Sequence, residues 1–166
     1  MNTPSVSPVG KGDIPDLMRI AFSCSLGYWS EHDLEYAVED AESIVLGLYD
    51  PNGQIIGFIS GRISGKRDQP AEIYNIGILL ELRRRGSGSL LLDAFIGKSI
   101  DAGASDVWLE VRDSSHAATQ FYISKGFTVS GRRRNFYSEP REDAILMTLK
   151  LSDAGTQVLD NNSGKS

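Results

Sequence analysis

Apolar and polar positions alternate in the first part of the chain in a pattern that predicts two helices and a strand pair. Helical spacing runs from Asp13, a suitable N-cap, to about Ser23, and a second helix begins at Ser30. The first helix is expected to bury Ile14, Leu17, Met18 and Ala21, and the second carries Asp33 as the acid of a weak capping box. Segments 43–49 and 54–63 flank the turn sequence Asp50-Pro51-Asn52-Gly53, which predicts a β-hairpin. Residues 4–9 are expected to form a short first strand.

Strands and helices follow one another in the middle of the chain. The pattern predicts a strand over residues 71–80, a helix from near Gly86 to Gly103 and a short strand over residues 107–111. The helix is expected to bury Leu91, Leu92, Phe95, Ile96 and Ile100. A strand–helix–strand order of this kind favours a right-handed parallel crossover.

The last part of the chain completes one domain. Ser115 is expected to cap a short helix that ends at Gly126, and residues 127–129 and 144–151 are expected to form two strands separated by a long polar excursion. From Asp153 onward the sequence is polar without a period, which predicts a disordered tail over residues 153–166. The sequence therefore predicts a single α/β domain over residues 1–152, with a mixed, mostly antiparallel sheet flanked by helices.

A glycine-containing turn between the strand at 71–80 and the following helix is the first chemical feature. It reads Arg83-Arg84-Arg85-Gly86-Ser87-Gly88-Ser89. The first N–H groups of a helix lack partners and carry partial positive charge, so this turn is suited to a phosphate, and the two glycines let a pyrophosphate approach the backbone. A simple helix entry with a solvated arginine run explains the same residues equally well. The dinucleotide fingerprint is excluded by Leu91 in place of its third glycine. The Gly-Lys-Ser/Thr triplet of a P-loop does not follow this turn, and the triplet at 164–166 has Leu159 in place of the required first glycine.

Composition narrows the class of protein further. The chain has 166 residues and a net charge of −5, from 17 basic and 22 acidic side chains, which argues against nonspecific nucleic-acid binding. Basic clusters at 83–85 and 132–134 on an acidic background fit an anionic cofactor and a cationic peptide substrate. Cys24 is the only cysteine, no apolar run spans a bilayer, and the N-terminus lacks a signal peptide. We therefore expect a cytoplasmic protein with no membrane partner.

The motifs, taken in order, resemble those of the GCN5-related N-acetyltransferases (GNAT). Arg83-x-x-Gly86-x-Gly88 after an apolar strand is similar to the acetyl-CoA signature, and the likeness continues through Trp108-Leu109-Glu110-Val111-Arg112, Phe121-Tyr122 and Gly126-Phe127. Segments 133–137 and 141–144 narrow the resemblance to the RimI type, which acetylates the N-terminal amine of a ribosomal protein. The resemblance covers most of the chain and implies two central parallel strands that splay apart, with acetyl-CoA in the gap and no metal.

The resemblance also implies which residues bind the cosubstrate. The phosphates would lie at the turn, and the pantetheine arm would pair with main chain of the preceding strand like an added strand. The implied contacts are Ile76, Gly77, Ile78, Arg83, Arg84, Arg85, Gly86, Ser87, Gly88, Ser89 and Ser115. Ser115 stands where RimI-type proteins usually carry an Asn that contacts the cofactor, and Tyr28 stands where a Pro usually precedes Trp29.

Two residues are expected to carry the chemistry. Glu110 is the candidate general base, because a carboxylate at the end of a buried strand loses hydration, and Tyr122 is the candidate general acid by resemblance. Judged alone, a Glu at a strand end is more often an ion-pair partner, here of Arg112, and Tyr122 is most simply a core tyrosine with a satisfied hydroxyl. Candidate walls for the acceptor are Tyr28, Trp29, Tyr74, Phe136 and Tyr137.

The predicted function is transfer of an acetyl group from acetyl-CoA to a protein N-terminal amine, by direct attack assisted by a base and an acid. Two alternatives stay open at this point. One is a GNAT enzyme that acetylates a small amine or a lysine side chain, and the other is a non-catalytic module that binds acyl-CoA.

Overall fold

A computed structural model describes residues 3–26 and 29–151 of the chain. Its centre is one seven-stranded sheet with the order β1-β2-β3-β4-β5-β7-β6. The strands are β1 (Ser5–Pro8), β2 (Ser43–Tyr49), β3 (Ile55–Arg62), β4 (Ala71–Ile78), β5 (Asp106–Arg112), β6 (Thr128–Ser138) and β7 (Arg141–Lys150). The helices are α1 (Ile14–Ser23), α2 (Glu31–Glu39), α3 (Ser87–Asp101) and α4 (His116–Ser124), with short 3-10 turns at Lys11–Asp13 and Leu80–Leu82.

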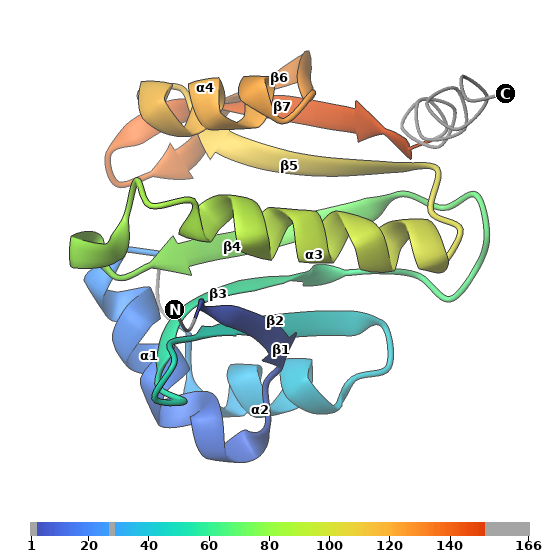
Figure 1. Cartoon of the computed structure of the whole chain (residues 1–166). Helices are drawn as coiled ribbons and strands as arrows, with labels where there is room; N and C mark the ends of the chain where they lie inside the picture. Colours follow the sequence, from blue (N-terminus) through green and yellow to red (C-terminus); the bar gives the residue numbers. More distant parts are fainter. Residues whose placement is uncertain (1–2, 27–28, 152–166) are drawn as a thin grey trace, which may run out of the picture.

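Two apolar cores lie on opposite faces of the sheet. Phe58 of β3 packs with the core of α1 and α2, whereas its neighbour Ile59 packs with the core that contains α3 and α4. Successive side chains of a strand point to opposite faces, so one strand supplies both cores. In Figure 1, α3 lies along β4. Helices α1 and α2 are grouped at one end of the sheet order, and α4 lies at the other.

Most of the predicted elements are confirmed. The mixed, mostly antiparallel sheet, the β2–β3 hairpin and the parallel crossover from β4 through α3 to β5 are all present. The capping box of α2 is complete, because Ser30 Oγ accepts from Asp33 N at 3.1 Å and Asp33 Oδ2 accepts from Ser30 N at 3.0 Å. The first strand forms as Ser5–Pro8 and pairs with β2.

The cap predicted at Asp13 is wrong in its contacts. Asp13 precedes α1, but its carboxylate accepts from Gly10 N at 2.9 Å and from the Tyr49 hydroxyl at 3.0 Å instead of from α1. The helix buries Ile20 fully, and Met18, predicted as core, is only partly buried. Asp13 therefore ties the start of α1 to β2, a contact that helical spacing does not contain.

The predicted polar excursion near the C-terminus is also wrong. Residues 128–138 and 141–150 form one long antiparallel hairpin, β6 and β7. β6 is at the edge of the sheet and has no buried residue, so it lacks the apolar alternation that marks a strand.

In α3, Ile100 is 46% exposed although it was predicted as core, and Ser99 is buried in its place. The predicted tail at 153–166 lies outside the described residues.

Candidate active site

The parallel strands β4 and β5 pair over a very short distance. Their register joins only Ala71 to Val107 and Glu72 to Trp108, after which no main-chain pairing between the two strands is described. Figure 1 shows the strands diverging toward the end where α3 and α4 begin. The remaining β4 main chain, from residue 73 to 78, therefore faces a gap in the sheet and can accept a strand-like ligand.

The glycine turn lies at one end of this gap. Gly86 has φ +79° and Arg84 has φ +62°, and the left-handed conformation of Gly86 directs the chain into α3, which begins at Ser87 without a side-chain cap. The N–H groups of the first turn are thus left for an outside acceptor. A groove of about 720 Å³ runs beside this turn. Its lining is Ile76, Ile78, Leu80, Arg83, Arg84, Gly86, Gly88, Ser89, Ala117, Ala118 and Phe121.

Seven of the predicted cosubstrate contacts line this groove, namely Ile76, Ile78, Arg83, Arg84, Gly86, Gly88 and Ser89. Gly77 faces away from it, since a Cβ there would meet Leu26 at 3.0 Å. Arg85 is exposed outside the lining, and the buried Ser87 hydroxyl donates to Leu82 O at 3.4 Å. The Arg83 guanidinium donates from Nε to Ile78 O at 3.0 Å, so this side chain also stabilises the end of β4.

A second cleft, of about 530 Å³, occupies the rest of the gap; we call it the reaction chamber. It is lined by Cys24, Ser25, Leu26, Ile73, Tyr74, Asn75, Ile76, Leu109, Glu110, Val111, Arg112, Ser115, Ala118, Tyr122 and Tyr137. Ile76 and Ala118 line both the groove and the chamber. The glycine turn and the two candidate catalytic residues, Glu110 and Tyr122, therefore lie along one continuous depression.

Glu110 lies at the floor of the chamber, with its side chain 15% exposed. Its partner is Arg133, whose Nε lies 3.2 Å from Glu110 Oε1. The expected pairing with Arg112 is wrong: Arg112 binds Glu142 at 2.9 Å. Burial, with the nearby charge of Glu110 as the second cause, raises the pKa of Glu72 on β4. Among the residues that line the chamber, Glu110 is the one carboxylate, and it is partly buried and paired with Arg133.

Tyr122 is 5% exposed but lines the chamber. Its ring packs edge-on against Phe127, with centroids 5.5 Å apart, and tilted against Phe121 at 5.3 Å. No described residue hydrogen-bonds its hydroxyl, and that oxygen is not one of the fully buried unpaired atoms, so it reaches the space of the chamber. Burial raises the pKa of Tyr122, so the hydroxyl stays protonated at neutral pH and is able to donate.

The candidate acceptor walls separate into two groups. Tyr74 and Tyr137 line the reaction chamber, and the Arg112 guanidinium lies over the Tyr137 ring at 4.1 Å. Phe136 lies outside the lining and packs edge-on against Tyr137 at 5.1 Å. Trp29 lines a neighbouring hollow, with Tyr74 between the two spaces. Tyr28 lies outside the described residues.

Ser115 does not cap α4 as predicted. It occupies the N-cap position with φ −83° and ψ 64°, and its side chain makes no capping hydrogen bond. Its carbonyl instead accepts from Thr119 N at 3.0 Å and Thr119 Oγ1 at 3.1 Å. The Ser115 side chain lines the chamber, which leaves it free to meet a ligand.

Sequence reasoning missed Arg133 as a site residue. The sequence predicts only a basic cluster at 132–134, and within it Arg132 is exposed and paired with Asp113 and Asp143 at 3.0 Å each. A bulge between Arg133 and Tyr137, where Asn135 has φ +52°, directs both of these flanking residues toward the site. The resemblance of segment 133–137 was the only sequence signal for this arrangement.

The described residues contain no group of three or more His, Cys, Asp or Glu side chains that could hold a metal ion. Within the same part of the chain no helix is long and apolar enough to cross a membrane.

A splayed pair of parallel strands, a glycine turn at the N-terminus of α3 and a carboxylate in the gap define an acetyltransferase-type site, and the chain belongs to the acetyltransferase (GNAT) family. The sequence profile of that family matches residues 14–127. Among its relatives is the [ribosomal protein bS18]-alanine N-acetyltransferase of Escherichia coli K12, 32% identical over 92% of this chain and 99% of the relative. The Haemophilus influenzae protein of the same name is 37% identical over 60% of this chain and 68% of its own length.

Solved structures agree with this assignment. The crystal structure of the Escherichia coli ribosomal-protein-S18-alanine N-acetyltransferase superimposes with a TM-score of 0.79, at 29% identity over 89% of this chain and 94% of the other. Arabidopsis thaliana NAA60, solved in complex with acetyl-CoA, gives 0.80 at 16% identity, covering 90% and 99%. The second likeness shows the fold alone, and both confirm the predicted splayed α/β architecture.

Proposed function

We propose that this enzyme transfers the acetyl group of acetyl-CoA to the N-terminal amine of a protein, with a bS18-type ribosomal protein as the first candidate acceptor. The observation that carries the proposal is the continuity of the groove and the reaction chamber through Ile76 and Ala118. One ligand can extend from the N-terminus of α3 to a point between Glu110 and Tyr122. The named relatives supply the acceptor class.

The residues present fit acetyl-CoA. Gly86 at φ +79° leaves open space where a side chain would stand, and the first-turn N–H groups of α3 are suited to the pyrophosphate. Arg84 lines the same groove and adds a guanidinium for phosphate oxygens. The unpaired main chain of β4 would hold the pantetheine arm, with Ile76 and Ile78 as apolar walls. When bound there, acetyl-CoA supplies an activated acetyl thioester.

Glu110 is suited to the role of general base. The amine that enters the chamber is an ammonium at neutral pH and must lose a proton before it becomes nucleophilic. The Glu110 carboxylate lies at the chamber floor and, through its ion pair with Arg133, is held in one orientation. It would receive that proton directly or through one water. The reference pKa of an α-amine is lower than that of a lysine side chain by more than two units, which favours an N-terminus as the acceptor.

Tyr122 is suited to the role of general acid. The sulfur that leaves must gain a proton, and the Tyr122 hydroxyl is protonated, reaches the chamber and has no hydrogen bond to a described residue. Its ring is fixed by Phe121 and Phe127, so the hydroxyl position is defined before the reaction begins. Tyr74 and Tyr137, on β4 and β6, form walls between which an extended acceptor could lie.

The test is a screen of peptides that differ in their first residue, incubated with acetyl-CoA and followed by release of free thiol. We expect turnover of peptides with a free N-terminus and none of the same peptides with a blocked N-terminus. Small amines and a peptide with a blocked N-terminus and an internal lysine are tested alongside. Turnover of those compounds instead would assign the enzyme to small-amine or lysine acetylation. Binding of acetyl-CoA without turnover of any acceptor would leave a non-catalytic acyl-CoA module.

A further inference from the structure

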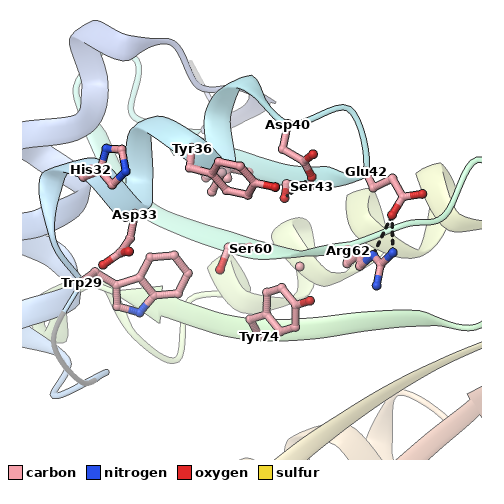
Figure 2. A pocket seen from close by; sticks show the side chains of 13 residues that line it. Trp29, His32, Asp33, Tyr36, Asp40, Glu42, Ser43, Ser60, Arg62 and Tyr74 are labelled. Atoms are coloured by element: carbon pink, nitrogen blue, oxygen red, sulfur yellow. Dashed lines mark hydrogen bonds and ion pairs between the residues drawn. The ribbon is translucent and has the colours of Figure 1, made fainter.

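A second depression lies beside the reaction chamber, on the side of α2; we call it the acidic hollow (Figure 2). Its volume is about 440 Å³, and α2, β2, β3 and β4 contribute its walls. The side chains that matter are Trp29, Tyr36, Asp40, Ser60, Arg62 and Tyr74. None of the groove or catalytic residues lines it. An occupant of the hollow would therefore be separate from acetyl-CoA and from the reacting groups.

The charge of the hollow is negative. Asp33, Asp40 and Glu42 line it against one guanidinium, that of Arg62. Two of these carboxylates are already engaged, since Asp33 completes the cap of α2 and Glu42 accepts from Arg62 Nε at 2.9 Å. Asp40 has only the Ser43 hydroxyl, at 2.8 Å, as a described side-chain partner. Asp40 therefore retains acceptor capacity for a cation.

Ser60 gives an independent indication of a ligand. It is 2% exposed, and its Oγ is the one buried side-chain oxygen or nitrogen in the described part of the chain without a hydrogen-bond partner. Figure 2 shows its side chain directed into the hollow between Tyr36 and Tyr74. Leaving a buried hydroxyl unpaired is unfavourable, and a hydroxyl oxygen readily accepts from an ammonium or guanidinium N–H. An occupant with N–H donors would satisfy it.

The walls of the hollow are aromatic. Tyr36 is 65% exposed and Tyr74 48% exposed, and the two rings come from α2 and β4. Trp29 Nε1 lies 3.2 Å from the Asn75 amide oxygen in the orientation that satisfies both Asn75 partners, which fixes the indole. Aromatic faces attract cations, most strongly where water is partly excluded.

The hollow and the reaction chamber meet at one residue. Tyr74 lines both, and Asn75 of the chamber holds Trp29 of the hollow. An extended chain advances about 3.3 Å per residue, so an acceptor whose amine faces Glu110 passes Tyr74 within its first few residues.

We propose that the acidic hollow binds a cationic side chain, lysine or arginine, at the second or third position of the acceptor chain. This inference rests on the proposed function, since it assigns a subsite to the same acceptor. Asp40 and Ser60 accept hydrogen bonds from the N–H groups of the cation, and Tyr36 and Tyr74 flank it. The enzyme thereby selects basic N-terminal sequences by a contact that is separate from the chemistry.

The experiment compares peptides that differ only in carrying lysine, norleucine, phenylalanine or glutamate at position 2 or 3. The parent should show a kcat/KM about fivefold or more higher for lysine than for norleucine at one of these positions. The advantage should shrink as ionic strength rises, because salt screens partly exposed charges. Asp40→Asn, which keeps an acceptor for Ser43, should bring the ratio toward one while leaving the norleucine peptide unaffected. Ser60→Ala should lower the ratio in the same direction.

Glu31→Gln is the matched control, because Glu31 is an exposed acid in the first turn of α2, the helix that Asp40 follows, and lies outside the hollow. It should keep the parent's ratio; an equal loss in this variant would mean general charge steering and would overturn the subsite. Equal rates for lysine and norleucine in the parent, or a preference for phenylalanine that Asp40→Asn leaves intact, would also overturn it. In those cases all peptides are still acetylated, so the proposed function stands. Absence of turnover with any free N-terminus would refute both.

Discussion

Replacing Tyr122 by Phe separates a catalytic hydroxyl from a core aromatic ring. The variant keeps the edge-on packing against Phe127 and the tilted packing against Phe121, so the buried apolar area is unchanged. The lost hydroxyl makes no hydrogen bond to a described residue, so none is broken by its removal. We therefore expect the free energy of unfolding to stay within about 0.5 kcal/mol of the parent's.

The rate should respond much more strongly. Loss of one general acid lowers a rate by about a hundredfold, which corresponds to about 2.7 kcal/mol of activation free energy. A thiol has a reference pKa of about 8.5 and leaves tolerably without help, so the loss should be smaller than that for Glu110→Gln. Because burial raises the pKa of Tyr122, the parent should keep its proton, and its rate, through mildly alkaline pH. The variant depends on protons from solvent and should lose further rate as pH rises.

The assay is kcat against pH for parent and variant, with thermal melts alongside. Tyr49→Phe is the matched control: the Tyr49 hydroxyl donates to Asp13 at 3.0 Å, and neither residue lines the chamber. That variant should lose about 1 kcal/mol of stability and no kcat. A Tyr122→Phe protein that melts early but turns over normally would show that the hydroxyl serves the core and refute the assignment.

Three further outcomes are expected. Glu110→Gln should lower kcat by more than about a hundredfold and leave acetyl-CoA affinity by calorimetry unchanged; a parent-like rate at neutral pH would reduce Glu110 to an ion-pair residue. Gly88→Val should weaken acetyl-CoA binding at least about tenfold by calorimetry. A Cβ at this position already lies 3.4 Å from Phe121, and the two methyl groups of valine would crowd the groove. Unchanged affinity in a folded variant would contradict phosphate binding at the glycine turn. The Arg112 side-chain hydrogen bond holds the pKa of Glu142 below its usual range, so its stabilisation is present above the ordinary carboxylate pKa and is lost as pH falls through the lowered one. Urea midpoints of parent and Glu142→Gln should therefore converge in acid, and a constant difference down to pH 3 would disprove the linkage.

Much of the site was predictable because it depends on local chain geometry. The turn at 83–89 combines a left-handed glycine with a helix start, and both properties are encoded within a few residues. Seven of the expected cosubstrate contacts line the groove for that reason, and Glu110 and Tyr122 both reach the chamber. Their catalytic roles stay predictions that the kinetic experiments above address.

The sequence by itself determined the elements whose signals are local. The Ser30–Asp33 capping box, the β2–β3 hairpin and the crossover through α3 each depend on neighbouring residues, and each formed as predicted. Only the tertiary structure decided the partner of Glu110, because Arg133 reaches it through the β5-β7-β6 order and a bulge in an edge strand. Such an edge strand is solvated on both faces and carries no apolar period. The same holds for the acidic hollow, since Asp40, Ser60 and Tyr74 come from separate elements and meet only when the sheet has formed around them.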